Sequence, residues 1–390
     1  MDLNKVAIFT ECFTPTTNGV VVSVKTFQEI LKPFGWEYII FAPSSRGFLD
    51  FDPSKVIRYP SFTWFSPKDY PLAVPFLAPR QTKKIFALKP VLVHTQHMFI
   101  MGKLGLNLGK KLHVPVIHTY HTLIAEYTHY AGFLSPLVKK YLIWKSRKYC
   151  NACDQIVTPS TQMKEVLVKY GVKTPIKVIP TGIKPENFAK PFTREEISQK
   201  WPSVPKDKVL VLYVSRVAKE KNLEMYFKAI KMLSEINKNF HLLIVGGGPE
   251  LDYFKNLAKE MKIDHCVTFA GMIPKGPGVD KIFGASDIFA FPSVTETQGI
   301  VIAEAMVSGT AVLAADRMGP KDIVKNNING LLIEPTEKAF SDSLDNLIND
   351  RELRERFSNQ GKIDALEFSE ENTAKKMNDL YEEVRSHYNS

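Results

Sequence analysis

Short apolar runs alternate along the chain with longer segments in which apolar residues recur at helical spacing. Val6–Phe9 is the first such run. The apolar residues that follow it fall on one face of a helix: Val20, Val24, Phe27 and Leu31. This alternation predicts a parallel sheet joined by right-handed crossovers. The other strands expected in this half are Glu37–Ala42, Val91–His94, Val116–Thr119, Gln155–Thr158 and Lys177–Pro180.

The same alternation restarts in the second half. Thr181–Pro205 is rich in Pro, Lys and Glu and predicts a linker at 183–205 between domains at 1–182 and 206–369. A helix is expected at the C-terminal end, over 370–390. Pro60–Arg80 is interpreted as a long irregular loop, either functional or packed on the surface. The strands expected in the second domain are Val209–Val214, Leu242–Val245, Val267–Phe269, Asp287–Phe291 and Thr310–Ala314.

Two glutamates follow the strand Asp287–Phe291 and carry the clearest chemistry. The apolar spacing after Gly299 predicts a helix that begins there, which places Glu296 in the preceding turn and Glu304 about two turns along the helix. The backbone N–H groups at this helix start, near Gln298 and Gly299, would favour a phosphate. Carboxylates accept hydrogen bonds from hydroxyl groups, as a sugar would offer. Together these features indicate a nucleotide-sugar site.

The stretch from Pro292 to Met306 reads Pro-Ser-x-x-Glu-x-x-Gly-x4-Glu-Ala-Met and resembles the signature of retaining glycosyltransferase family 4. This resemblance implies an α/β GT-B fold, with two Rossmann-like domains whose parallel sheets face each other across a cleft. It also implies that the last helix crosses back to the first domain. The scattered histidines do not supply a coherent set of metal ligands. We therefore expect a nucleotide-sugar donor and no metal or other cofactor.

The resemblance assigns further residues to the donor. Ser215-Arg216, followed by Lys221, is similar to the family's Gly-Arg-x4-Lys, with Ser215 replacing the usual glycine. Arg216 and Lys221 would stabilise the charge of the departing diphosphate, and Lys219 would face solvent. Glu296 would contact donor hydroxyls, and Glu304 would hold the ribose.

Other donor and active-site contacts are expected at strand ends. Asn18 and Gly19 would let the backbone approach the donor phosphates, although Asn18 is equally suited to cap a helix. The family's active-site histidine aligns with His121, or with His118 if the register differs. Gly246–Gly248 is interpreted as a tight strand-to-helix turn rather than a dinucleotide fingerprint. The remaining expected contacts to substrate are Ile273, near the nucleotide base, and Tyr127.

Composition places the protein among soluble globular chains. The 390 residues are 44% hydrophobic and 24% charged, and no apolar run approaches the length of a membrane span. The first residues lack a signal-peptide core, so a cytoplasmic protein is expected. Four cysteines are too few for a disulfide scaffold, and Cys150 and Cys153 without further ligands do not make a metal site.

The net charge of +10 calls for an acidic partner. No nucleic-acid-binding motif is present, so nucleic acid is not expected. A basic helix with apolar neighbours near Leu137–Lys148 is compatible with docking on anionic headgroups at the inner face of the cell membrane, or with an ordinary surface helix. The residues proposed to dock are Lys139, Lys140, Trp144, Lys145, Arg147 and Lys148.

The motifs around His121 and Glu296 are similar to those of family members that glycosylate diacylglycerol. The resulting prediction is a peripheral enzyme that moves a hexose, glucose or galactose, from a UDP-sugar to 1,2-diacylglycerol with retention of configuration. The alternatives are a phosphatidylinositol mannosyltransferase that uses GDP-mannose, a glycan-extending transferase of the same family and, outside enzymes, a membrane-bound scaffold.

Overall fold

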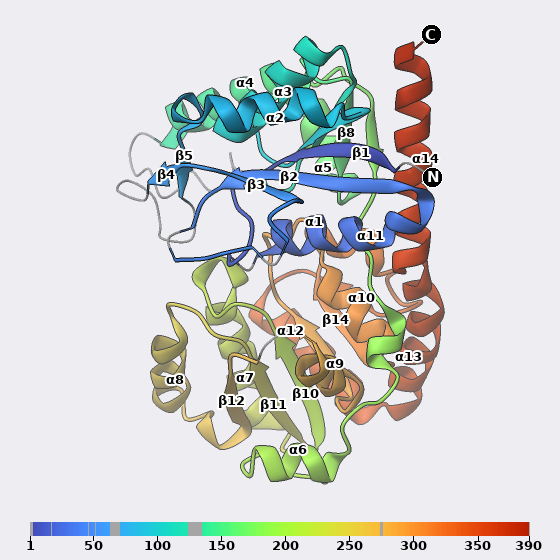
Figure 1. Ribbon diagram of the computed structural model, residues 1–390. Helices are drawn as coiled ribbons and strands as arrows, with labels where there is room; N and C mark the ends of the chain where they lie inside the picture. The colour runs from blue at the N-terminus through green and yellow to red at the C-terminus, as the bar shows by residue number, and fades with distance from the viewer. Residues whose placement is uncertain are drawn as a thin grey trace. The chain divides into compact units, whose positions relative to one another are not determined.

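The computed structural model describes residues 3–16, 18–45, 47–50, 52–62, 71–123, 135–273 and 276–389. They form two compact units (Figure 1). The first unit comprises 1–182 together with 370–390, and the second comprises 183–369. The C-terminal helix is therefore part of the first unit, whereas the predicted linker 183–205 is part of the second.

The first unit is built on a seven-stranded parallel sheet with the order β3-β2-β1-β6-β7-β8-β9. The strand order reverses between β1 and β6, which is where ligands bind in open sheets of this kind. Between β3 and β6 along the chain, two short strands, β4 Ser61–Phe62 and β5 Leu72–Ala73, form a separate antiparallel pair. The strands of the sheet are β1 Asn4–Phe9, β2 Trp36–Pro43, β3 Val56–Tyr59, β6 Leu92–Thr95, β7 Val116–Thr119, β8 Gln155–Thr158 and β9 Ile176–Val178.

Helices cover both faces of this sheet. In Figure 1, α2, α3 and α4 lie above it and α1 below it, as right-handed crossovers in opposite directions require. Asn18 caps α1, because its side chain accepts from the N–H of Val21. The helices are α1 Gly19–Ile30, α2 Pro79–Leu88, α3 Ile100–Leu112, α4 Ser135–Cys150, α5 Thr161–Lys169 and α14 Glu370–Asn389, with 3₁₀ turns η1 Lys32–Phe34 and η2 Pro75–Leu77.

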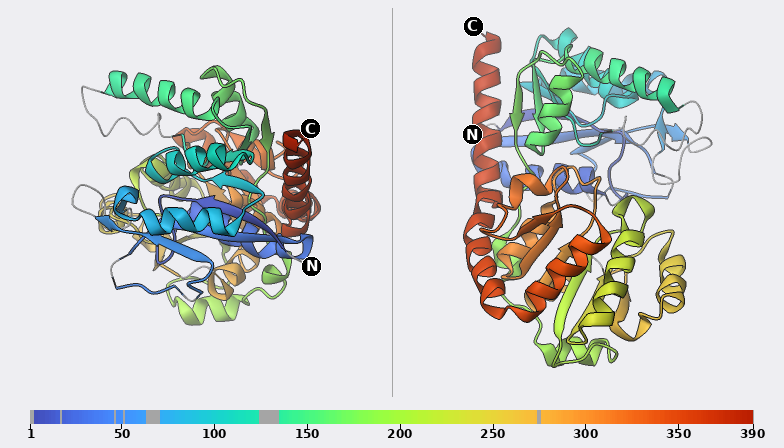
Figure 2. Two further views of the ribbon diagram at one scale, coloured as in Figure 1. Left: turned by 45° about the horizontal axis from the view of Figure 1, so that its top comes forward. Right: turned by 180° about the vertical axis from the view of Figure 1, so that it is seen from behind.

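Helix α14 runs beside the other elements of the first unit (Figure 2). Buried polar and aromatic side chains attach it there. The Tyr381 hydroxyl lies 2.6 Å from that of Tyr38 and 2.7 Å from His94 Nδ1, and Trp36 Nε1 donates to Asn378. Because these polar atoms are buried and partnered, they fix the orientation of the helix as well as its attachment.

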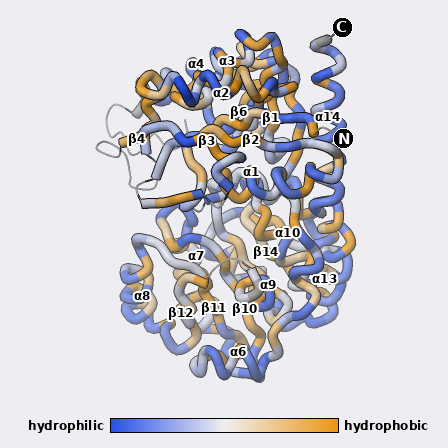
Figure 3. The backbone as a smooth tube through the Cα atoms, viewed as in Figure 1, coloured by the Kyte–Doolittle hydropathy of each residue, from blue (hydrophilic) through white to orange (hydrophobic). Residues whose placement is uncertain are grey.

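The second unit is a six-stranded parallel sheet with the order β12-β11-β10-β13-β14-β15, whose order reverses between β10 and β13. Hydrophobic residues concentrate along the strands of both units (Figure 3), as expected for sheets covered on both faces. The strands are β10 Val209–Val214, β11 Phe240–Val245, β12 Val267–Gly271, β13 Ile288–Phe291, β14 Ala311–Ala315 and β15 Leu331–Ile333.

The predicted linker folds as part of this second unit. Phe188, Ile197 and Val204 are buried in its core, and Thr193 begins α6 with a capping box. Its Pro, Lys and Glu content reflects a short capped helix rather than a flexible connection. The helices are α6 Arg194–Lys200, α7 Leu223–Ile236, α8 Leu251–Glu260, α9 Pro277–Gly284, α10 Ile300–Val307, α11 Pro320–Ile323, α12 Glu337–Asn349 and α13 Arg351–Ala365, with 3₁₀ turns η4 Pro185–Phe188, η5 Lys219–Lys221, η6 Asp264–Cys266 and η7 Leu366–Phe368.

The expected α/β class with two Rossmann-like parallel sheets is confirmed. Every strand expected from the sequence is present, with bounds that differ by one or two residues at several ends. Two edge strands, β3 and β15, were not expected. The segment 60–80 is less irregular than expected, because its described residues include β4, β5 and η2.

Candidate active site

The predicted residues of the second unit follow β10 and β13, the two strands at its reversal of strand order. Arg216 and Lys221 come after β10, and Glu296 comes after β13. The carboxyl ends of parallel neighbouring strands share one edge of the sheet, so the two segments meet there. The structure brings Lys221 and Glu296 into direct contact.

Lys221 and Glu296 form an ion pair, with Lys221 Nζ 2.9 Å from Glu296 Oε2. The Lys221 side chain is 11% exposed and that of Glu296 25% exposed. A cation and a hydroxyl acceptor thus lie side by side, largely shielded from water. This pairing suits a ligand that joins an anionic group to a sugar.

The loop that carries Glu296 is held by backbone contacts on two sides. Thr295 Oγ1 donates to the Glu220 carbonyl, 3.1 Å away, and the Gly319 N–H donates to the Glu296 carbonyl, 3.0 Å away. A side chain at Gly319 would come within 2.6 Å of the Gln298 backbone. Glycine at 319 therefore permits the close approach that fixes this loop.

Glu304 lies on α10, as the sequence predicted, and is buried. Gly299 is the N-cap residue of this helix and has a φ of 79° and a ψ of 33°, in the left-handed region that favours glycine. Glu296 precedes the helix and Glu304 lies within it. The predicted placement of the two carboxylates on either side of the helix start is confirmed.

Arg216 has a more open position than Lys221. Its guanidinium donates to Glu220 Oε1 at 2.7 Å, and its side chain is 69% exposed. Lys219 is exposed, as expected. Glu220 contacts both Arg216 and Thr295, the residue before Glu296. Arg216 is therefore linked through Glu220 to the loop that carries Glu296. Its role at the diphosphate stays a prediction.

The glycines after β11 form a tight turn against the segment after β10. A side chain at Gly246 would come within 1.8 Å of the Ser215 carbonyl oxygen, and one at Gly248 within 2.2 Å of that of Val217. The interpretation as a close-packed strand-to-helix turn agrees with this geometry. Ile273 follows β12 and is partly buried against the core.

In the first unit, histidines gather at the carboxyl ends of β6 and β7. His118 is buried, with Nδ1 2.9 Å from Thr95 Oγ1, and His94 is buried between Tyr381 and Thr119. His121 is half-buried and donates through Nε2 to Gln96 Oε1, 2.7 Å away.

Burial lowers the pKa of His94, His118 and His121 to about 3, and neighbouring histidines add to the effect. The three rings are therefore neutral at physiological pH. A neutral His121 that donates through Nε2 presents Nδ1 as an acceptor. His121 is thus the more accessible of the two predicted candidates, and His118 belongs to the buried network.

The loop between β1 and α1 contains residues that sequence reasoning missed. The Glu11 carboxylate accepts from the N–H of Met101, 2.6 Å away, at the start of α3, and the Glu11 N–H donates to His97 Nδ1, 3.2 Å away. Asn18 donates to Cys12 Sγ as well as capping α1, and Gly19 begins that helix. The position of Glu11, two residues after a predicted strand, was the available signal.

Burial raises the pKa of the Glu11 carboxyl to about 7, although the two backbone N–H groups and Lys145 oppose this. The folded protein thus holds a proton more tightly than the unfolded chain, so stability falls as pH rises from about 4.5 to 7. We expect Glu11→Gln, which keeps the acceptor oxygen, to raise the free energy of unfolding by about 3 kcal/mol at pH 8 and by little at pH 4.5. Thermal melts at both pH values measure this.

Glu165→Gln is the matched control, since Glu165 is exposed on α5. It should change the melting temperature little at either pH. A Glu11→Gln protein less stable than wild type at pH 8 would contradict the expectation and show that the charged hydrogen bonds outweigh the cost of burial.

The basic helix expected from the sequence is α4. Lys140, Trp144, Arg147 and Lys148 are exposed on it, and Lys139 is half-buried. Lys145 differs from the expectation. Its Nζ lies over the Phe99 ring, 4.3 Å from the centroid, and burial lowers its pKa. Lys145 therefore packs toward Phe99 at the start of α3.

Tyr127 lies outside the described residues. None of the helices in the described part of the chain combines the length and hydropathy needed to span a bilayer. Within the same residues, the potential metal ligands His, Cys, Asp and Glu do not converge in groups of three or more. Cys150 and Cys153 are both buried as free thiols.

Two Rossmann-like units with parallel sheets are the architecture of the GT-B class of glycosyltransferases. A family model described as "Glycosyltransferase Family 4" matches residues 17–187, and one described as "Glycosyl transferases group 1" matches residues 193–364. The chain belongs to glycosyltransferase family 4 and is a hexosyltransferase.

Several known proteins resemble the chain over most of its length. Alpha-monoglucosyldiacylglycerol synthase of Streptococcus pneumoniae is 29% identical over 97% of this chain and 85% of its own. The protein of that name from Acholeplasma laidlawii is 27% identical over 97% and 96%. GDP-mannose-dependent alpha-mannosyltransferase of Corynebacterium glutamicum is 27% identical over 85% and 76%.

Solved structures of low sequence identity share the fold. Anabaena HepE, determined in complex with UDP, superposes with a TM-score of 0.78 at 17% identity and covers 97% of this chain and 100% of its own. At that identity the likeness establishes the fold alone.

Proposed function

We propose that the protein transfers a hexose, glucose in the first instance, from a UDP-sugar to 1,2-diacylglycerol with retention of configuration. The ion pair between Lys221 and Glu296 carries the donor part of this proposal. Lys221 would stabilise the negative charge that develops on the leaving diphosphate. Glu296 would accept hydrogen bonds from hexose hydroxyls, and Glu304 would hold the ribose. The leaving phosphate would serve as base on the same face of the sugar, without a metal.

The first unit supports a lipid acceptor. Between Tyr70 and Cys153 the chain contains twelve Lys and Arg residues and a single acidic residue, Glu126, so this segment accounts for the whole net charge of +10. Its helices α2, α3 and α4 lie together above the sheet (Figure 1). A basic face of this kind attracts anionic lipid.

Helix α4 adds apolar side chains to that charge. Leu137, Tyr141 and Trp144 are 67%, 54% and 45% exposed and recur at intervals of four and three residues, so they share one face. Lys148 Nζ lies over the Trp144 ring, 5.0 Å from the centroid. Aromatic rings beside lysines suit the membrane interface. We propose that this face docks on the cytoplasmic leaflet and gives the enzyme access to diacylglycerol.

The proposal is tested with vesicles of phosphatidylglycerol and diacylglycerol, incubated with the protein and each of UDP-glucose, UDP-galactose and GDP-mannose. We expect a monohexosyl diacylglycerol by mass spectrometry with a UDP-sugar, and the same rate after addition of EDTA. Product only from soluble sugar acceptors would refute the lipid acceptor. Loss of turnover in EDTA, restored by Mg²⁺ or Mn²⁺, would refute the metal-free reaction.

A GDP-mannose-dependent transferase is the second candidate, because a relative of that name matches most of the chain. The two candidates differ in the nucleotide that protects the protein. Under our proposal UDP raises the melting temperature more than GDP at equal concentration, since the stability that a ligand adds to the folded state rises with the logarithm of its affinity. Stronger protection by GDP would favour the mannosyltransferase.

A further inference from the structure

One arginine on β3 forms a hydrogen bond to the loop between β1 and α1. Arg58 lies on β3 and donates through Nη2 to the Thr14 carbonyl, 2.7 Å away. Its Nη1 donates to the Pro43 carbonyl, 2.8 Å away, at the end of β2. One guanidinium thus ties three successive segments of the first unit together.

An acidic partner fixes the same guanidinium. Arg58 Nε and Nη2 donate to the two carboxylate oxygens of Asp50, at 2.8 Å and 2.6 Å. The Arg58 and Asp50 side chains are 17% and 10% exposed. The guanidinium carbon also lies 5.7 Å and 5.8 Å from the ring centroids of Phe13 and Phe48. The planar group is therefore hydrogen-bonded along its edges and lies within cation–π distance of two aromatic rings.

These contacts occupy Arg58 within the protein, so it is not available as a direct ligand for a donor phosphate. What it holds is Thr14, four residues before the Asn18 cap of α1. The opposite side of the loop is held by the contacts of Glu11 with His97 and α3. Arg58 supplies the restraint on the side of β3.

We propose that Arg58, oriented by Asp50, is a positioning residue that holds the β1–α1 loop in the conformation needed to bind the nucleotide-sugar donor. This inference rests on the proposed function and on the prediction from the sequence that Asn18 and Gly19 of that loop approach the donor phosphates. Arg58 acts on the reaction through the loop and does not touch the substrate.

Arg58→Lys is the decisive variant. Lysine retains a positive charge for Asp50, but its single nitrogen cannot satisfy the carboxylate and two carbonyls at once or stack as a plane. We expect kcat/KM for the donor to fall by about tenfold to a hundredfold, because small displacements of binding groups have effects of that size. KM for the lipid acceptor should be unchanged. Asp50→Asn should shift the donor constant in the same direction by less.

Hydrogen exchange gives a readout that does not depend on turnover. In Arg58→Lys the backbone amides of the β1–α1 loop and the first turn of α1 should exchange faster than in wild type. The amides of β6 and β7 in the same unit should keep their wild-type rates.

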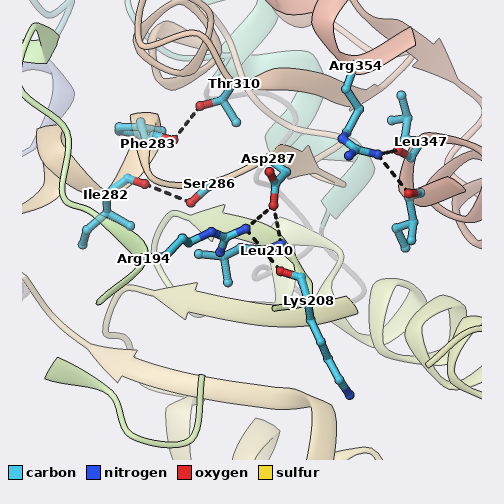
Figure 4. A network of polar contacts seen from close by, with 11 residues as sticks. Arg194, Lys208, Leu210, Ile282, Phe283, Ser286, Asp287, Thr310, Leu347 and Arg354 are labelled. Carbon is cyan, nitrogen blue, oxygen red and sulfur yellow. Dashed lines mark hydrogen bonds and ion pairs between the residues drawn. The ribbon is translucent and has the colours of Figure 1, made fainter. Parts of the chain in front are cut away.

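A second partly buried arginine–aspartate pair provides the matched control (Figure 4). Arg194 donates to Asp287, which also accepts from the Leu210 N–H, and to the Lys208 carbonyl. This pair lies at the start of β10 and β13, at the opposite ends of these strands from Lys221 and Glu296. Arg194→Lys makes the same chemical change away from both donor-binding segments. It should lower the melting temperature while leaving KM for the donor near the wild-type value.

The outcomes separate this inference from the proposed function. If the wild-type protein makes no glycolipid, the proposed function fails, and Arg58 is still judged from loop exchange and from UDP release by hydrolysis of UDP-glucose, or GDP release from GDP-mannose. Unchanged donor constants and unchanged loop exchange in Arg58→Lys would overturn the inference. Equal losses in Arg58→Lys and Arg194→Lys would also overturn it, because they would show a general effect of stability.

Discussion

Lys221→Met is expected to lower kcat by about 10²- to 10³-fold, the size of effect seen when one fixed donor to a developing negative charge is removed. Lys221 is mostly buried and pairs with Glu296, so it is held in place before the diphosphate leaves. Methionine keeps the length and apolar stem of the side chain but removes the charge. Single-turnover rates with UDP-glucose and diacylglycerol vesicles measure the chemical step.

Lys219→Met is the control for this substitution. Lys219 lies two residues away in the same 3₁₀ turn but is exposed, so the same change should leave kcat within about twofold of wild type, as surface charges are screened by water and salt. Equal losses in the two variants would show that the positive charge of the segment matters rather than the pair with Glu296. A Lys221→Met protein with wild-type kcat would contradict the proposed role of Lys221 in stabilising the leaving diphosphate.

Reversal of two charges on α4, Lys140→Glu with Lys148→Glu, is expected to abolish binding to anionic vesicles. Each basic residue near an anionic surface contributes about 1 kcal/mol, so a change of four charge units weakens partitioning by about a thousandfold at low salt. Both residues are exposed, and Lys148 lies over Trp144 on the apolar face of the helix. Vesicle sedimentation measures binding, and product formation should fall with it.

Lys164→Glu with Lys169→Glu makes the same change of net charge on α5, where both lysines are exposed. If α4 is the docking surface, this second double variant should keep most of its vesicle binding. Equal loss in both would show that binding depends on net charge alone. Hydrolysis of UDP-glucose without acceptor should survive in both variants, because neither changes a residue that is predicted to contact the donor.

The regular elements could be predicted from local pattern. Apolar residues recur every two residues in a half-buried strand and about every 3.6 residues in a helix, so neighbouring residues reveal the element. Buried parallel strands such as β10 are continuous apolar runs. The edge strands β3 and β15 were missed because they are short and only partly buried, which weakens the apolar signal. Residues 183–205 were misassigned because polar composition conceals a few buried apolar side chains, Ile197 among them.

The site divides in the same way. Glu296 and Glu304 could be placed from sequence, since each stands close to a predicted strand end or helix start, and Lys221 was assigned from the resemblance to the family's Gly-Arg-x4-Lys. Arg58 and Glu11 could not be assigned a role, because their partners Thr14, Asp50 and Met101 come from other loops and helices. Similarly, nothing in the helical pattern of α4 shows that Lys145 turns toward Phe99.

The sequence by itself determined the two parallel α/β units, the order of the chemical motifs and the basic character of the first unit. Those properties depend on residues close together in the chain. The tertiary structure alone decided which polar groups pair: Lys221 with Glu296, Arg58 with Asp50, and Glu11 with the start of α3. Burial and hydrogen bonding between distant segments set those pairings, and both arise only when the crossovers bring strand ends together.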